Sequence, residues 1–331
     1  MRLRRNILLA AAPALLAAIS PRPSAWGANS AANAVYRGAI VVDAASGRVL
    51  FEDHADEISP PASMTKLMTF AVLDDRIRSG ALTMQTPIAV TPADARVGML
   101  PDSTSVWLKT GETFPVEELI YAMMIQSAND AAYALAHASA GSVPVFVEWM
   151  NAKARALGMT RTTFRSPNGL PPPSRRIADG DLTTPRDFST LCRYLLQQTD
   201  ILRYTSVKSR PFGAGRRFPP TQMTNHNHLL GRIAGVDGLK TGFTGGAGFC
   251  LSATASRDGR RIIAIMMDSP DSKTRDLKIA QLIERGFAVD SVMVPAVRVP
   301  GTPAGPPDSS PTRPAPAANP GIRYPIPGTT P

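Results

Sequence analysis

The sequence is poor in the residues on which metal and redox sites depend. It holds two cysteines and four histidines among 331 residues, and Cys192 and Cys250 form no Cys-x-x-Cys motif. His226 and His228 alternate with asparagines, so on a strand both would face the same side. A zinc site needs at least one more protein ligand, and the other histidines are far away in the sequence. We therefore predict polar, loop-lining histidines, no metal site and no cofactor.

Two other features are missing. The sequence has no glycine-rich phosphate loop. It also has no stripe of arginines interleaved with aromatic residues, which would be typical of a nucleic-acid-binding surface, so nucleic acid is not an expected partner. What remains is an ordinary globular composition, with 44% apolar and 19% charged residues. The chain is long enough for one large or two modest domains.

The N-terminal residues have the form of a signal peptide. Three arginines precede the apolar run of residues 7–18, and prolines and small residues follow it. The apolar run is too short for a comfortable membrane span. We predict a signal peptide over residues 1–27, cleaved between residues 27 and 32, and an exported protein of the periplasm or cell envelope. The pair Arg4-Arg5 also loosely resembles a twin-arginine signal, but the usual flanking residues are missing.

The C-terminal residues have a second distinct composition. From residue 295 to residue 331 proline is the commonest residue, and glycine, serine and threonine fill much of the rest. Such a segment cannot bury enough apolar surface to fold. We therefore predict a disordered tail over residues 294–331 and a folded domain over residues 33–293.

Export changes how the charge and the cysteines are interpreted. The formal charge of +10 falls to +6 when the four arginines of residues 1–27 are removed. A modest positive charge is compatible with an acidic polymer as partner. In an oxidising compartment Cys192 and Cys250 could pair, but both lie in apolar stretches that would bury free thiols equally well.

Between the two ends, the pattern changes from strand to helix and back to strand. Gly47 suits a tight turn between two β-rich runs, which predicts a hairpin. The expected strands cover residues 36–43, 48–52, 238–243, 248–255 and 261–267. The expected helices cover residues 63–78, 115–125, 130–138, 145–157, 184–197 and 272–287, and residues 81–114 are predicted to form loops and short strands.

This order of elements predicts an α+β fold. A two-stranded hairpin is marginal alone, so we expect the early and late strands to join in one antiparallel sheet. Helices would cover that sheet, and an inserted helical subdomain would lie beside it. A cleft is expected between the sheet and the subdomain.

The stretch that follows Pro60 and Pro61 is apolar on every face, which is typical of a helix at the centre of a domain. Ser63 and Lys66 are two polar residues near its start, and they are neighbours on one helix face. An apolar environment and the positive end of the helix dipole would both lower the pKa of a lysine there. A neutral lysine beside a serine hydroxyl is a nucleophile with its own base. A capping serine followed by a solvated lysine is the alternative.

Three short motifs stand in chain order and decide between these alternatives. They are Ser-x-x-Lys at residues 63–66, Ser-x-Asn at residues 127–129 and Lys-Thr-Gly at residues 240–242. Together they are the signature of penicillin-binding proteins and class A β-lactamases. The chain resembles a low-molecular-mass penicillin-binding protein, a serine-type D-alanyl-D-alanine carboxypeptidase of the β-lactamase and transpeptidase superfamily. The resemblance also covers Asn168-Gly169-Leu170, the asparagine–histidine stretch 225–230 and residues 236–239.

The resemblance implies a function and a set of residues. Ser63 would be the acylated nucleophile, Lys66 its base, and Ser127 the group that passes a proton to the leaving D-alanine. The substrates would be peptidoglycan stem pentapeptides, and β-lactams would be covalent inhibitors. The substrate-binding residues that it implies are Asn129, Lys240, Thr241, Gly242, Phe243 and Arg275.

Each implied binding residue has a stated task. Asn129 would hold the peptide amide, and Lys240 with Thr241 would bind the terminal carboxylate, as suits an anionic chain end. The oxyanion hole would be the backbone N–H groups of Ser63 and Phe243. Arg275 is where the family often has an arginine near that carboxylate.

Departures from the family limit what is carried over. No second β-rich domain and no amphipathic anchor helix follow residue 287, so no stable membrane anchor is predicted. Between Asn129 and Lys240 the only glutamate is Glu148, within an expected helix, so the water-activating glutamate of class A β-lactamases is not evident. A D,D-endopeptidase of the same family and a non-catalytic wall-binding protein remain as alternatives.

Overall fold

The computed structural model describes residues 35–291. The predicted signal peptide, over residues 1–27, and the predicted proline-rich tail, over residues 294–331, lie outside the described residues. Within residues 35–291 no helix is long and apolar enough to cross a membrane.

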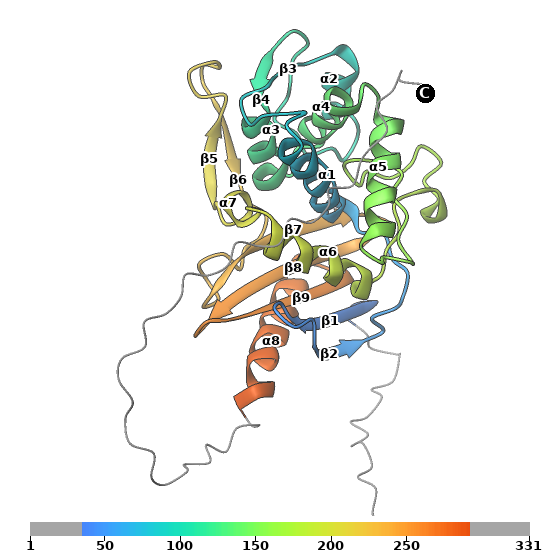
Figure 1. Cartoon of the computed structure of the whole chain (residues 1–331), viewed down its shortest axis with the longest axis vertical. Helices are drawn as coiled ribbons and strands as arrows, with labels where there is room; N and C mark the ends of the chain where they lie inside the picture. The colour runs from blue at the N-terminus through green and yellow to red at the C-terminus, as the bar shows by residue number, and fades with distance from the viewer. Residues whose placement is uncertain (1–34, 292–331) are drawn as a thin grey trace, which may run out of the picture. The chain divides into compact units, whose positions relative to one another are not determined.

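One five-stranded antiparallel sheet joins the two ends of the described chain, as predicted (Figure 1). Its strand order is β2-β1-β9-β8-β7, so β7 is an edge strand that carries the Lys-Thr-Gly motif. Asp258 and Gly259, both with positive φ, make the tight turn between β8 and β9. The bounds of the strands are β1 Gly38–Asp43, β2 Val49–Asp53, β7 Val236–Thr244, β8 Gly248–Arg257 and β9 Arg260–Ser269.

The sheet separates two hydrophobic cores because its central strands bury both faces. In β9, Ile263 and Ile265 belong to the larger core, and Ile262 and Ala264 belong to the smaller one. Helix α8 (Ser272–Ser291) covers the smaller core with Ile279 and neighbouring apolar residues. The predicted antiparallel sheet covered by helices is therefore confirmed.

The larger core lies under the helices that come between β2 and β7 in the sequence. These helices lie on the side of the sheet away from α8 (Figure 1). Helix α6 (Pro185–Gln198), capped by Thr184 as predicted, packs against β1 and β9. The remaining helices are α1 Lys66–Arg78, α2 Pro92–Gly98, α3 Val116–Tyr121, α4 Asn129–Ala140, α5 Val143–Ala156 and α7 Leu202–Thr205.

Helix α1 is the buried centre of the larger core. Every residue from Lys66 to Leu73 is buried, which confirms the interpretation of its all-round apolar sequence. The helix begins three residues later than predicted, because Ala62–Thr65 form a single 3-10 turn, η2. Ser63 therefore lies in η2, and Lys66 is the first residue of the α-helix.

Several short elements were not predicted. Helix α2 was placed among loops, although Thr91 and Asp94 form a reciprocal capping box at its start. The pattern starting at Pro115 is not one helix, because α3 gives way to a π-helical turn, η3 (Ala122–Gln126). The other unpredicted elements are η4 Ile177–Asp179, α7, β5 Ser209–Phe212 and β6 Thr221–Thr224, while β3 Pro87–Ala89 and β4 Thr113–Pro115 match the predicted short strands.

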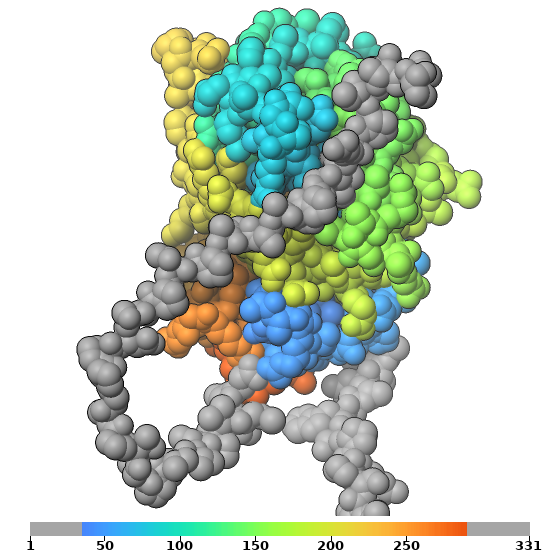
Figure 2. Space-filling view, in the orientation of Figure 1, coloured from blue at the N-terminus to red at the C-terminus, as the bar shows by residue number. Residues whose placement is uncertain are grey.

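The β5–β6 hairpin packs beside the segment that leads into β4 (Figure 2). The guanidinium of Arg217 donates to Glu112 and to the backbone carbonyl of Trp107, and the rings of Phe114 and Phe212 lie 4.7 Å apart. These contacts attach the hairpin to the helical part of the protein.

Strand β7 approaches η2 so closely that only a glycine fits at residue 242. A Cβ atom on Gly242 would lie 2.5 Å from the carbonyl oxygen of Pro61 and 3.1 Å from Cβ of Ala62. The third residue of the Lys-Thr-Gly motif therefore allows the edge strand to lie against the turn that contains Ser63.

We expect Gly242→Ala to destabilise the protein, because β7 and η2 must separate to accept the methyl group. Overpacking of this kind costs about 1–3 kcal/mol, which is a fall in Tm of roughly 2–10 °C for a domain of this size. Gly245→Ala is the matched control, since nothing lies within 4 Å of its added Cβ. Thermal unfolding of both variants tests the contact, and equal Tm values would contradict it.

Candidate active site

Ser63 is presented on a turn that is held from two sides. Ala62, the residue before it, has a left-handed backbone with φ of 48°. Gly169, with φ of 79°, lies against the same turn, and a Cβ on it would be 1.9 Å from the carbonyl oxygen of Ala62. Glycines 169 and 242 thus let two distant segments close on η2 and fix the position of Ser63.

Lys66 is fully buried, and its amine makes three short polar contacts. Its Nζ lies 2.8 Å from Oγ of Ser63, 2.7 Å from Oδ1 of Asn129 and 2.7 Å from the backbone carbonyl oxygen of Asn168. The structure therefore brings together the first two predicted motifs and adds a backbone group from a third segment.

Burial lowers the pKa of Lys66 well below its usual range, and the charge of Lys240 lowers it further. The carboxylates of Asp181 and Asp130 act in the opposite direction. Both acids are themselves buried and are engaged by protein donors, so neither forms a direct ion pair with the lysine among the described contacts. A neutral amine follows from the lack of an adjacent counter-ion in an apolar environment.

The contacts of Lys66 place its amine within reach of the Ser63 proton. A neutral amine has two N–H groups and one lone pair. Oδ1 of Asn129 and the carbonyl of Asn168 are acceptors only, so they take the two N–H groups. Once the amine is neutral, its lone pair can be directed at the Ser63 hydroxyl, whose Oγ lies 2.8 Å from Nζ. This geometry suits removal of a proton from Ser63.

Ser127 and Asn129 lie where the π-helical turn η3 meets α4. Ser127 has a left-handed backbone, with φ of 62° and ψ of 28°, and its N–H donates to the carbonyl of Ala122. Asn129 is the first residue of α4, and its Nδ2 donates to Oγ of Ser103 while its Oδ1 contacts Lys66. The side-chain orientation of Asn129 is therefore held at both ends.

Lys240 is also buried, on edge strand β7, and its Nζ donates to the carbonyl of Thr241. Burial, with a smaller contribution from the charge of Arg275, lowers the pKa of Lys240 to about 7. Arg275, on α8, is buried and donates to Asp276. The predicted binding residues Lys240, Thr241 and Arg275 thus form one cationic region.

Phe243 differs from its neighbours on β7 because its side chain is 54% exposed. Its ring stacks on Phe249 with the centroids 4.1 Å apart. On an edge strand, alternate backbone N–H groups point away from the paired strand. The predicted role of Phe243 involves only such a backbone group.

The two histidines lie in the loop beyond β6, as predicted. They face different environments: His228 is exposed beside Asp276, while His226 is half-buried. Burial, followed by the charge of Lys240, lowers the pKa of His226 to about 4. His226 therefore borders the cationic region as a neutral imidazole. No group of three potential metal-ligating side chains occurs among residues 35–291.

Sequence reasoning left three further groups without a role. Asn168 supplies a carbonyl to Lys66, and Asp181 accepts hydrogen bonds from Thr65 and Ser166 behind η2. His226 is the third. The resemblance covers Asn168 but implies no role for it, and Asp181 gives no sequence signal because its partners are distant in the sequence. The cysteines, whose pairing was left open, are both free and buried.

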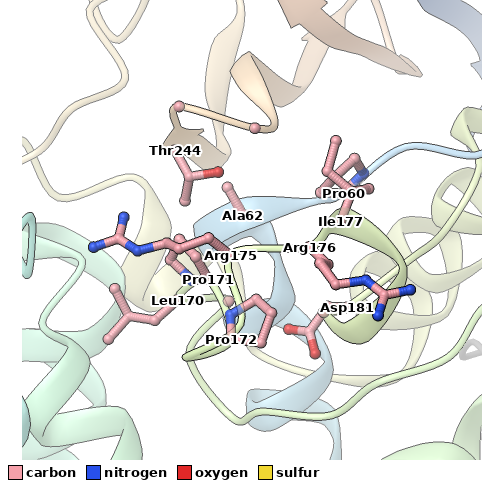
Figure 3. Close-up of a pocket in the computed structure, with 14 residues that line it drawn as sticks. Pro60, Ala62, Leu170, Pro171, Pro172, Arg175, Arg176, Ile177, Asp181 and Thr244 are labelled. Atoms are coloured by element: carbon pink, nitrogen blue, oxygen red, sulfur yellow. The ribbon is translucent and has the colours of Figure 1, made fainter.

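A cavity of about 260 Å³ lies next to Ala62, the residue before Ser63, between the end of β7 and the loop that follows Gly169 (Figure 3). Its walls include Ala62 and the backbone of Thr244, Gly245 and Gly246 on one side. The loop contributes prolines, Ile177 and two arginines on the other. The predicted cleft beside the sheet is therefore present.

Comparisons with known proteins agree with this site. Residues 27–271 match the family model described as D-alanyl-D-alanine carboxypeptidase. The chain is 34% identical over 262 residues to D-alanyl-D-alanine carboxypeptidase DacC of Escherichia coli, covering 78% of this chain and 63% of that protein. It is 29% identical over 254 residues to DacF of Bacillus subtilis, covering 76% and 62%. The chain thus spans less than two thirds of the length of these two relatives.

Solved structures agree as well. Penicillin-binding protein D2 of Listeria monocytogenes, in its ampicillin-bound form, is 32% identical with a TM-score of 0.66, covering 76% of this chain and 97% of that one. Penicillin-binding protein 5 of Haemophilus influenzae is 28% identical with a TM-score of 0.70, covering 79% and 73%.

The pKa of Lys240 predicts how stability depends on pH. Because burial lowers the folded-state pKa to about 7 from 10.5, the unfolded state binds more protons between these values. The contribution of Lys240 to stability therefore rises with pH over that range, by up to about 1.4 kcal/mol per pH unit. We therefore compare the free energy of unfolding of Lys240→Met with that of the unmodified protein. The difference should favour the variant most at pH 7 and should shrink towards pH 10.

Denaturant unfolding at several pH values measures this difference. Lys240→Arg is the control, because a guanidinium stays charged throughout and cannot reproduce the rise. If the difference in free energy of unfolding between Lys240→Met and the unmodified protein does not vary with pH, the lowered pKa of Lys240 is contradicted.

Proposed function

The chain belongs to the D-alanyl-D-alanine carboxypeptidase family, and from that premise we propose that it removes the terminal D-alanine from peptidoglycan stem pentapeptides. The observation that supports this most directly is the buried Lys66 amine, 2.8 Å from Oγ of Ser63 and held by two acceptors. Acyl transfer needs a nucleophile, a base, oxyanion donors and an acid for the leaving group. Each has a candidate in this site.

The first step is acylation. Lys66 accepts the Ser63 proton while Oγ bonds to the carbonyl carbon of the scissile peptide. The electron pair of the carbonyl moves onto its oxygen, which the backbone N–H groups of Ser63 and Phe243 stabilise. The carbon–nitrogen bond then breaks, and the D-alanine nitrogen takes a proton through the hydroxyl of Ser127, which is resupplied from Lys66. The product is an ester on Ser63.

The cationic region sets which bond is cut. Lys240, Thr241 and Arg275 bind the carboxylate of the terminal D-alanine, and Asn129 holds a peptide amide. A charge-assisted contact to a carboxylate is stronger than a neutral one. The scissile bond is therefore the one next to a free chain end. Gly242 contributes by letting β7 approach Ser63.

The second step is hydrolysis of the ester. Lys66 takes a proton from a water molecule, whose oxygen attacks the ester carbon, and the Ser63 hydroxyl is restored. β-Lactams acylate Ser63 in the same way and are inhibitors. Glu148 is exposed on α5, and both oxygens of Asp181 accept hydrogen bonds from the protein. Neither suits the activation of a water for rapid β-lactam turnover, so β-lactamase activity is disfavoured.

We extend the proposal to location and domains. The protein is exported, with residues 1–27 as signal peptide, residues 33–293 as the catalytic domain and residues 294–331 as a tail. Its acidic peptide substrates and its envelope location follow from the proposed activity.

Lys66→Arg should abolish acylation, because a guanidinium cannot be deprotonated and cannot act as a base. Labelling with a fluorescent penicillin measures acylation directly, and circular dichroism checks that the variant folds. Ser63→Ala should also lose labelling, and Lys273→Arg, at an exposed position, should retain it. Labelling of Lys66→Arg at a rate similar to that of the unmodified protein would show that the base is another group.

The proposed activity itself is tested with a pentapeptide that ends in D-Ala-D-Ala. We expect release of a single D-alanine. Converting the terminal carboxylate to an amide should lower kcat/KM by at least about tenfold, because a charge-assisted contact with Lys240 is lost.

A crosslinked muropeptide in the same digest tests the endopeptidase alternative. Its carboxylate lies beside a large side chain, so we expect slower cleavage than that of the pentapeptide. Mass spectrometry of both products decides, and faster loss of the crosslinked dimer would reverse the assignment.

A further inference from the structure

The site orients a bound peptide along β7. The terminal carboxylate is assigned to Lys240 and Thr241, and the scissile carbonyl oxygen to the N–H of Phe243. A substrate peptide that binds first at Lys240 and Thr241 and then at Phe243 continues towards Thr244 and the residues after it. Strand β7 is the edge of the sheet, and an exposed sheet edge accepts an extended peptide. The part of the substrate that becomes attached to Ser63 therefore lies beside Thr244, Gly245 and Gly246.

The cavity at the end of β7 lies on this acyl side of the site (Figure 3). It is bordered by Ala62, next to the nucleophile, and by the same three residues at the end of β7. The residue that donates the scissile carbonyl is D-alanine, whose methyl group cannot fill about 260 Å³. One residue further along an extended chain is about 3.3 Å away, so the next side chain of the stem peptide is the first that can enter.

The cavity combines apolar walls with two cationic groups. Leu170, Pro171 and Ile177 form apolar surface suited to a chain of methylene groups. The guanidinium groups of Arg175 and Arg176 lie on opposite sides of the cavity (Figure 3). This combination suits a long side chain with an anionic end.

The two arginines are available to a ligand. Arg175 is 65% exposed and lies 3.9 Å from Asp102, and Arg176 is 76% exposed and lies 3.9 Å from Asp179. These separations exceed hydrogen-bond distance, and exposed ion pairs contribute about 0–1 kcal/mol. A bound carboxylate can therefore recruit either guanidinium at little cost.

Asp181, the acidic residue in the cavity lining itself, forms no ion pair with either arginine among the described contacts. Its Oδ1 accepts from the backbone N–H groups of Arg165 and Ser166. Its Oδ2 accepts from the hydroxyls of Thr65 and Ser166, and burial raises its pKa. The carboxyl group is thus already satisfied by the protein, and it gives a ligand ammonium no strong partner.

We propose that this cavity binds the third residue of the stem peptide and selects a side chain that ends in a carboxylate, held by Arg175 or Arg176. The inference rests on the proposed carboxypeptidase function and adds to it a substrate class. A third residue with only an ammonium at its end meets two cations and is disfavoured.

Three pentapeptides that differ only at the third residue test the proposal. They carry diaminopimelate, diaminopimelate with its side-chain carboxylate converted to an amide, and lysine. We expect the unmodified protein to prefer the first over each of the others by about tenfold in kcat/KM, the scale of one charge-assisted contact. In the double variant Arg175→Gln/Arg176→Gln the three values should become equal within about twofold.

Arg155→Gln is the matched control, because Arg155 is exposed on α5 and does not border this cavity. It should keep the preference of the unmodified protein. Equal cleavage of the three peptides by the unmodified protein would overturn the inference while leaving the proposed function intact. A preference that persists in the double variant, or an equal loss for all three peptides, would also overturn it by placing the selecting contact elsewhere.

Failure of the proposed function has a different signature. In that case the unmodified protein would release no D-alanine from any of the three peptides and would not be labelled by a fluorescent penicillin.

Discussion

Burial of the Lys66 amine without an adjacent carboxylate is the constraint on which the rest of the site depends. A charged amine in that position would be costly, so the neutral form is favoured and its lone pair faces the Ser63 hydroxyl. The protein holds this arrangement with acceptors from two other segments, Asn129 at the start of α4 and the backbone of Asn168. The same core that stabilises the fold therefore sets the protonation state on which the proposed chemistry relies.

The second constraint is close backbone approach around η2. Gly169 and Gly242 come from a loop and an edge strand that are far apart in the sequence, and each lies where a Cβ would collide with the Ser63 turn. Strand β7 can then present Lys240 and Thr241 on one side of the nucleophile and an open edge on the other. In the proposed binding mode, cations lie at both ends of the substrate. Lys240 and Arg275 are assigned to the leaving-group side, and Arg175 and Arg176 to the acyl side. This distribution suits a peptide with negative charge at more than one place.

Much of the fold could be predicted from local patterns. The antiparallel sheet and the terminal helix follow from the order of strand and helix patterns and from turns such as Asp258-Gly259, and the central helix follows from a run that is apolar on every face. Short elements were missed, because α2 and the β5–β6 hairpin are too short to show a period and are stabilised by distant contacts such as Arg217 with Glu112. The sequence also does not show whether Cys192 and Cys250 form a disulfide, and only the structure shows that both are free and buried.

The sequence by itself determined the family, and it nominated the residues proposed to carry the chemistry, because three short motifs in order are specific even though each alone is weak. Only the tertiary structure decided how those residues interact. The pKa of Lys240, the neutral imidazole of His226 and the carbonyl of Asn168 at Lys66 all depend on burial and on neighbours tens to hundreds of residues away. The acyl-side cavity likewise forms where a loop folds over the end of β7. Desolvation and proximity are properties of the packed chain, and no local pattern of residues encodes them.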